Sequence, residues 1–262
     1  MDTFVPVSGF DSSRLKNTIL ILPVVSIGNV PQLTVDLILT TLELERVGFL
    51  DDPNVVSLAG PNENGRGITV AVEVFVTKDG KYTVIQQRTP PHKNHSTRFS
   101  SNLVAFIKTH GFADVLILSS ADATLRRDMQ LAGQPFRVLS TPNISSGLQK
   151  RIEQLGLVKL EPSFGQDEPT PSQPEELPAD GVPKIAGGGY SRTLFQKATE
   201  QGVEAAMLVM FAMEGDNIPH SKAMVECVDR LLGLSAEGVR EWRAPKSWRW
   251  MFGAPAAREL YD

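Results

Sequence analysis

The sequence predicts an α/β fold, and two apolar runs that are each followed by a turn are the observations that predict it. Residues 18–25 and 114–119 form short, nearly continuous apolar runs with β-branched side chains, as is typical of strands buried on both faces. Turns that bear glycine or serine follow at 26–29 and 119–122, where open α/β sheets build ligand sites. The length of 262 residues suits one large domain or two small ones.

The first half of the chain combines a helical pattern with strand patterns. Apolar residues spaced by three and four predict a helix over 31–44, with Pro31 at the first helical position, where its missing N–H is not needed. Alternating apolar residues over 68–76 predict a strand with one buried face. Asp79-Gly80 then predicts a hairpin turn into a strand over 82–88. Two further segments are predicted as a short strand and a loop, at 55–59 and 60–67.

Helical patterns are more frequent in the second half. The patterns predict helices over 97–110, 149–155, 191–200 and 203–214, a strand over 136–140, and a last helix that starts near Pro219. Gly111 ends the first of these helices as a C-terminal cap. The last helix has a buried face made of Met224, Val225, Val228, Leu231 and Leu232.

Residues 161–183 differ in character from the rest of the chain. They include six prolines and six acidic residues, with no lysine or arginine. Such a segment cannot bury enough apolar surface to offset the entropy of ordering it, so we expect a mobile acidic surface loop. A domain linker is the alternative, but the sequence that follows is too small to fold alone. We therefore expect one domain over 1–253.

Composition and charge exclude several classes of protein. The net charge of −4 and the pI near 5.7 argue against a general nucleic-acid binder, which usually has a basic excess. The single cysteine, Cys227, excludes an internal disulfide and a CxxC metal or redox site. The N-terminus does not resemble a signal peptide, and no apolar run approaches the roughly 20 residues of a membrane helix. We expect a soluble protein of the cytosol or the nucleus, without nucleic-acid or membrane partners.

Three turns are the candidates for a catalytic cleft: 26–29, 119–122 and Gly187–Gly189, whose backbone N–H groups could hold a phosphate. No GxGxxG motif, Walker lysine or GxSxG elbow accompanies them. A tight, close-packed turn is the favoured interpretation of the glycine run. No local motif nominates a catalytic triad, so we find no positive sign of catalysis.

The histidines and the cysteine give weak signals. His92 and His95 have no acidic or cysteine neighbour in the sequence, whereas a metal site normally needs three or four ligands, so a solvated loop is favoured. His110 precedes a helix-ending glycine, where a cation near the negative end of the helix dipole is common. Cys227 lies in an apolar helical pattern and is interpreted as a small core residue.

The C-terminal region contains all three tryptophans within nine positions, at Trp242, Trp248 and Trp250. A terminal segment strapped onto the core is favoured over a nucleotide-stacking patch. Residues 254–262 predict a flexible tail, which ends in a hydrophobic–Tyr–any pattern at Leu260, Tyr261 and Asp262. A carboxylate, a phenol and an apolar side chain together suit a pocket that captures a chain terminus, although a frayed end is favoured for three residues taken alone.

The chain as a whole resembles the proteasome assembly chaperone 2 family. The order and spacing of five motifs carry the resemblance, and the first and fourth are long enough to be specific. These motifs are Leu22 to Ile38, Leu116 to Ser120, Gly187–Gly189 with Thr193-Leu194, Glu214 to Pro219, and Pro245 to Arg249 with Phe252-Gly253. The acidic loop over 161–183 departs from the family in sequence and length.

The resemblance implies a single-domain α/β sandwich with a mixed central sheet, related to nucleoside phosphorylases but without their activity. It also implies a heterodimer with proteasome assembly chaperone 1 that binds the outer face of the ring of proteasome α subunits. The family's tail inserts between adjacent α subunits and matches Leu260, Tyr261 and Asp262 here. No nucleotide or metal cofactor is expected. The alternative is an enzyme of the nucleoside phosphorylase or hydrolase type.

Overall fold

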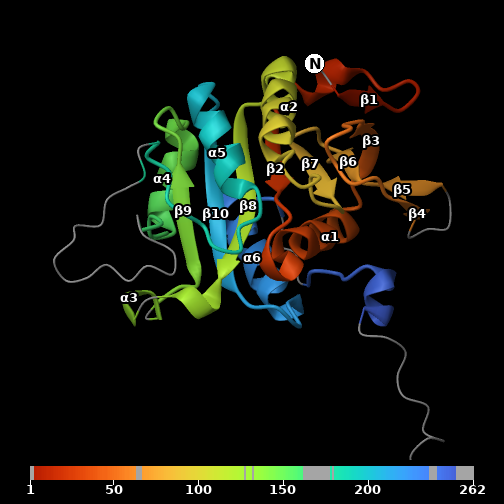
Figure 1. Cartoon of the computed structure of the whole chain (residues 1–262). Helices are drawn as coiled ribbons and strands as arrows, with labels where there is room; N and C mark the ends of the chain where they lie inside the picture. Colours follow the sequence, from red (N-terminus) through yellow and green to blue (C-terminus); the bar gives the residue numbers. More distant parts are fainter. Residues whose placement is uncertain are drawn as a thin grey trace, which may run out of the picture.

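The computed structural model describes residues 3–62, 67–126, 128–131, 133–161, 178, 180–235 and 241–251. A mixed central sheet runs through the molecule, with helices on both faces (Figure 1). In order across the sheet, its strands are β1 (Phe4–Pro6), β3 (Glu45–Leu50), β6 (Val72–Val76), β7 (Tyr82–Gln87), β2 (Ile19–Pro23), β8 (Asp114–Asp122), β10 (Ala205–Ala212) and β9 (Phe136–Ser140).

The centre of the sheet is parallel and its two sides are antiparallel. β7, β2, β8 and β10 pair in parallel, whereas β9 and the β1–β3–β6 side pair antiparallel. β4 (Ala59–Pro61) and β5 (Ile68–Val70) form a separate two-stranded ribbon. The predicted α/β fold with a mixed central sheet is confirmed, while the likeness to nucleoside phosphorylases stays a prediction.

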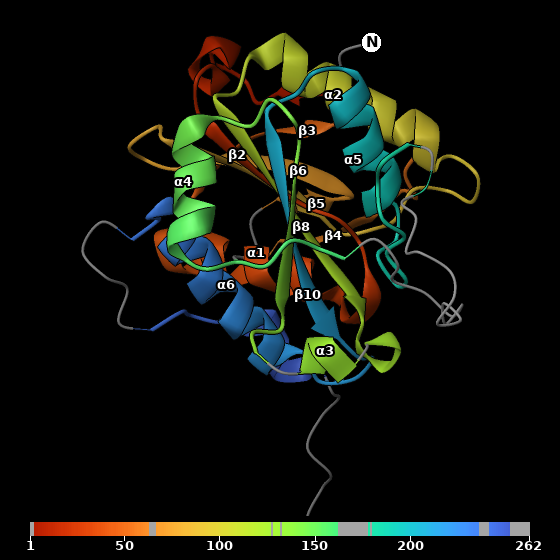
Figure 2. The same cartoon turned by 90° about the vertical axis from the view of Figure 1, so that its left-hand side faces the viewer.

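The helices divide between the two faces of the sheet (Figure 2). One face is covered by α2 (Ser96–His110) and α5 (Ser191–Glu200), and the other by α1 (Val30–Leu42), α4 (Ser146–Gln154) and α6 (Ile218–Leu232). The short helix α3 (Asp128–Leu131) and four 3-10 turns, η1 (Ser12–Leu15), η2 (Ile27–Asn29), η3 (Ala123–Leu125) and η4 (Lys246–Trp250), lie in the connections.

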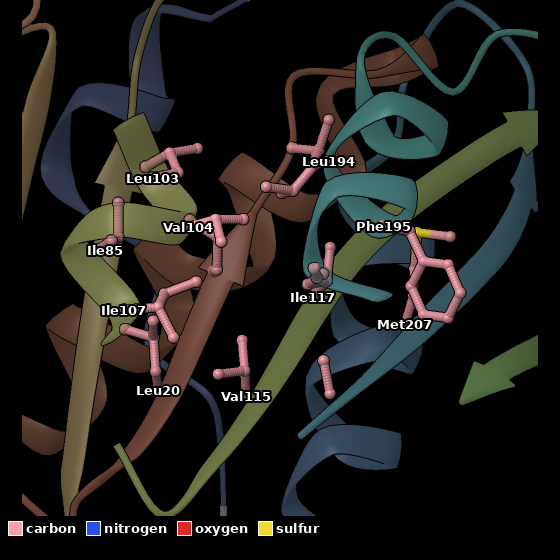
Figure 3. Close-up of a cluster of buried hydrophobic side chains, with 14 of the residues drawn as sticks. Leu20, Ile85, Leu103, Val104, Ile107, Val115, Ile117, Leu194, Phe195 and Met207 are labelled. Carbon is pink, nitrogen blue, oxygen red and sulfur yellow. The ribbon is translucent and has the colours of Figure 1, made fainter. Parts of the chain in front are cut away.

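Each face of the sheet buries its own apolar cluster. Figure 3 shows the cluster under α2 and α5, where helix side chains meet those of β2, β7, β8 and β10. The labelled members are Leu103, Val104 and Ile107 of α2, Leu194 and Phe195 of α5, and Leu20, Ile85, Val115, Ile117 and Met207 of the strands. The second cluster, under α1, α4 and α6, includes Cys227 and two of the tryptophans. The strands between the two clusters are therefore apolar on both sides, as parallel strands usually are.

Four sequence predictions are wrong in detail. The helix predicted over 203–214 is instead strand β10 at Ala205–Ala212, because a run that is buried all round carries no periodicity to separate the two structures. Residues 68–76 divide at Ala71 into β5 and β6, which belong to different sheets. Residues 55–59 contain one bridge, from Val55 to Pro91, and the strand starts only at Ala59. Residues 119–122 are the last part of β8 instead of a turn.

The other predicted elements are confirmed within a few residues at their ends. They comprise β2, β7, β9, α1, α2, α4, α5 and α6, together with the hairpin between β6 and β7. Most of the predicted loop at 161–183 and the whole predicted tail at 254–262 lie outside the described residues. Among the described residues, no helix is both long and apolar enough to cross a membrane.

Candidate functional site

The three segments predicted as turns of a catalytic cleft lie together in space, at the carboxyl ends of β2 and β8, although 119–122 is the end of β8 itself. The Ile27 N–H donates to the Gly187 carbonyl oxygen at 2.8 Å, and the Asp122 N–H donates to the Ala186 oxygen at 2.9 Å. The Oγ atoms of Ser26 and Ser120 lie 2.7 Å apart, and both residues are buried. Backbone groups and hydroxyls, rather than titratable side chains, thus join the turns into what we call the turn cluster.

The turn cluster is packed against itself at the glycine run. A Cβ atom placed on Gly189 would lie 2.0 Å from the Val25 carbonyl oxygen, and its φ of +60° is a conformation that side chains disfavour. A Cβ atom on Gly187 would lie 3.1 Å from Ile27. The close-packed turn predicted for this run is confirmed. At the glycine run, the protein's own backbone packs closely against the glycines. A phosphate-binding turn would need open space at that position.

Hydroxyl groups around the cluster are buried in their neutral form. The Tyr190 hydroxyl, at the start of α5, donates to Gln87 Oε1, and burial raises the pKa of Tyr190 far above its ordinary value. The Ser191 Oγ is buried and has no hydrogen-bond partner among the described residues. A phenol held protonated and a serine without a base beside it give neither a nucleophile nor a general base at neutral pH.

The histidine loop contains no assembled metal site. His95 Nδ1 lies 2.8 Å from Asn54 Oδ1, and the rings of His92 and His95 make an edge contact with centroids 5.9 Å apart. Within the described part of the chain, no three His, Cys, Asp or Glu side chains converge on a point where a metal could bind. The position of His95 is explained by its hydrogen bond to the segment before the β4–β5 ribbon.

A second region of interest is a cleft of about 1160 Å3. It is lined by α1, strands β3 and β6, and residues 243–247. Three ion pairs line it, each joining different segments: Arg46–Glu73 at 2.7 Å, Arg88–Asp36 at 2.8 Å and Arg243–Glu43 at 3.0 Å. The hydrogen bond from Arg243 lowers the pKa of the Glu43 carboxyl below its ordinary value. These six charges therefore neutralise one another pairwise, and Lys246 is a further cation in the lining.

Asp36 lines this cleft and is buried. It accepts hydrogen bonds from Gln86 at 2.7 Å and from both terminal nitrogens of Arg88, and Trp248 Nε1 donates to it at 3.4 Å. The sequence reasoning missed Asp36 and its partners. The available signal was a lone acidic residue between the apolar Val35 and Leu37 of a predicted helix, because such a carboxylate must find partners when the helix packs.

The tryptophan-rich segment is strapped onto the core, as predicted. Trp242 and Trp248 are 8% and 9% exposed and belong to the apolar cluster under α1 and α6. The side chain of Trp250 and the predicted partner-binding residues Leu260, Tyr261 and Asp262 lie outside the described residues. The segment that the structure describes ends at Met251, eleven positions before Asp262.

Comparisons with known proteins place this arrangement among chaperone-related folds. The PAC2 family model matches residues 20–238. Proteasome assembly chaperone 2 of Bos taurus is 31% identical over 98% of this chain and 100% of that protein. The protein of the same name from Danio rerio is 33% identical over 94% of this chain and 96% of that protein.

Two solved structures from Pyrococcus furiosus have a similar fold. PbaA, described as an archaeal homolog of proteasome-assembly chaperone, has a TM-score of 0.59 at 18% identity and covers 84% of this chain and 83% of its own. PbaB, described as an archaeal proteasome activator, has a TM-score of 0.60 at 15% identity and covers 89% of both chains. At these identities the two structures establish a shared fold alone.

Proposed function

The chain belongs to the PAC2 family, and on that premise we propose that it is a non-enzymatic chaperone of proteasome assembly. The observation that carries the proposal is similarity along nearly the whole chain to proteins named proteasome assembly chaperone 2, at 31–34% identity for vertebrate relatives. The packing of the turn cluster supports the non-enzymatic part, since backbone contacts occupy the position of a phosphate cradle.

The finer parts of the proposal rest on the family resemblance. The chain acts as a heterodimer with proteasome assembly chaperone 1, in the cytosol or the nucleus. The heterodimer binds the outer face of the proteasome α-subunit ring. Leu260, Tyr261 and Asp262 enter a pocket between adjacent α subunits, where an apolar side chain, a phenol and a carboxylate each find a complementary group.

Replacing Tyr261 tests the tail. In the full chain, Tyr261→Ala is expected to weaken binding to purified α-subunit rings by about 10-fold or more, because a buried aromatic anchor commonly dominates such contacts. Surface plasmon resonance or a competition assay measures the affinity. Arg258→Ala is the matched control in the same tail and should bind as the unchanged chain does.

Thermal unfolding and association with proteasome assembly chaperone 1 should be the same for all three chains. If Tyr261→Ala bound the rings as tightly as the unchanged chain, the proposed role of the tail would be wrong. Loss of the heterodimer in the same variant would instead assign Tyr261 to that interface.

A further inference from the structure

Residues 241–251, the C-terminal strap, cross the outer side of the layer formed by α1 and α6. Figure 1 shows this segment in dark blue near α1. Its indole side chains Trp242 and Trp248 are buried in the apolar cluster of that layer, while Arg249 and Met251 are exposed. These two large buried side chains hold the strap to the core as far as Trp248, and the Met251 N–H donates to the Trp248 carbonyl oxygen at 3.2 Å.

The first polar anchor of the strap is at the end of α1. The Arg243 N–H donates to Thr41 Oγ1 at 2.8 Å, and its guanidinium donates to the carbonyl oxygens of Thr40 and Thr41 at 3.0 and 2.9 Å. These carbonyls belong to the last turn of the helix, where backbone acceptors lack partners and a cation is favoured by the helix dipole. Arg243 therefore fixes the strap to α1 by both main chain and side chain.

The second polar anchor is Asp36, which precedes Thr40 and Thr41 on the same helix by slightly more than one turn, roughly four to five residues. Trp248 Nε1 donates to Asp36 Oδ2, whose carboxylate is in turn held by Arg88 and Gln86. Both anchors are on α1, which packs against the sheet and α6. The strap is thus attached to a rigid helix at two points before Met251.

We infer that the C-terminal strap fixes the point from which the tail leaves the body, so that Arg243 and Trp248 are positioning residues for binding to the α-subunit ring. This inference rests on the proposed function of the tail. Eleven residues, 252–262, follow Met251, and they span at most roughly 40 Å when fully extended. A fixed exit point confines Tyr261 to the volume within that reach.

The size of the effect follows from tether length. Releasing the strap beyond Trp242 would nearly double the number of residues that follow the last fixed position, from eleven (252–262) to 20 (243–262). The effective concentration of a tethered group falls as about the −3/2 power of tether length, so doubling the length lowers it roughly three-fold. Ring binding that depends on the tail should weaken by the same factor, while contacts made by the body stay unchanged.

Two variants of the full chain test this. Arg243→Ala combined with Trp248→Ala releases the strap beyond Trp242, and insertion of eleven Gly/Ser residues after Met251 lengthens the chain before the tail with every strap contact intact. Arg249→Ala removes an equal charge from an exposed position of the same strap and is the matched control. Each change is made with Tyr261 present and with Tyr261→Ala, and affinity for purified α-subunit rings is measured.

We expect the release and insertion variants to bind about three-fold more weakly than the unchanged chain, and Arg249→Ala to bind equally well. With Tyr261→Ala, the release and insertion should have no further effect, because they act only through the tail. A strap that merely stabilised the body would weaken both backgrounds alike, and that result would overturn the inference, as would wild-type affinity of the insertion variant. If Tyr261→Ala alone bound the α-subunit rings as tightly as the unchanged chain, the proposed role of the tail would be wrong. The inference about the strap would then be wrong as well.

Discussion

The turn cluster and the C-terminal strap both join segments that are far apart in the sequence, but they use different groups to do so. The turn cluster is joined by main-chain hydrogen bonds and by glycines that allow one backbone to touch another, as at Gly189 and Val25. The strap is held chiefly by side chains: Trp242 and Trp248 are buried in the apolar cluster under α1 and α6, and Arg243 binds the last turn of α1. The turn cluster is therefore an integral part of the fold, whereas the strap is a peripheral segment that packs onto it.

This difference predicts what substitutions can do in each place. In the turn cluster, a side-chain atom added at Gly189 must displace the backbone of Val25, so that substitution changes the fold itself. In the strap, a shortened side chain removes an anchor and leaves the sheet and its helices in place. Substitutions that change function without changing the fold are therefore expected at the strap, while the turn cluster preserves the fold that supports it.

The largest effect should come from Gly189→Ala in the turn cluster. The new Cβ would overlap the Val25 carbonyl oxygen at 2.0 Å and would require a left-handed φ of +60°. We expect a loss of roughly 3–5 kcal/mol in the free energy of unfolding, combining the conformational cost with overpacking. Chemical denaturation followed by circular dichroism measures it.

Gly202→Ala is the matched control, because Gly202 has a similar φ of +67° but no atom within 4 Å of its added Cβ. That variant should lose only about 1 kcal/mol, the conformational cost alone. Equal losses for the two variants would mean that the close packing of the turn cluster adds nothing to stability.

An intermediate effect is expected at Asp36, which ties the strap to the interior. In Asp36→Asn an amide nitrogen replaces one acceptor oxygen, so one of the donors of Gln86 and Arg88 loses its acceptor and the Arg88 guanidinium loses its compensating charge. We expect a loss of about 2 kcal/mol, reduced from the value for a fully buried pair because Arg88 is partly exposed. Glu43→Gln, in an exposed ion pair of the same helix, should leave the unfolding midpoint unchanged. A midpoint for Asp36→Asn that matches the control would remove Asp36 as an anchor.

Much of the fold could be predicted because its central strands and amphipathic helices carry local signals. The apolar runs at 18–25 and 114–119 correspond to β2 and β8, and the three- and four-residue spacings correspond to α1 and α6. The sequence of β10, AAMLVMFA, is apolar at every position and rich in good helix formers. Its pairing with β8 on one side and β9 on the other makes it a strand, and that pairing depends on tertiary structure rather than on local sequence.

The candidate site was less predictable than the fold. The glycine run could be interpreted from composition, since three adjacent glycines indicate close backbone approach. The network around Asp36 joins residues from α1, the end of β7 and the strap, which are separated by 50 to 212 positions. No local pattern encodes such a meeting. The same holds for Glu73, which the alternation over 68–76 places on the exposed face but which is 3% exposed beside Arg46.

The smallest perturbation to the molecule is chemical labelling of Cys227, the one cysteine in the sequence, which lies in the apolar cluster that the strap covers. Burial raises its thiol pKa from 9.0 to about 11, so at pH 8 the folded chain has about 100-fold less thiolate than the unfolded chain and should react correspondingly more slowly with iodoacetamide. The folded chain holds the Cys227 thiol proton more tightly than the unfolded chain does. The free energy of unfolding should therefore fall as the pH rises from 9 to 11. Mass spectrometry of the time course measures the labelling rate. Combining Arg243→Ala with Trp248→Ala should speed labelling of the folded chain if the strap opens locally, whereas labelling of the unchanged chain at the unfolded rate would show that the layer under the strap is not closed.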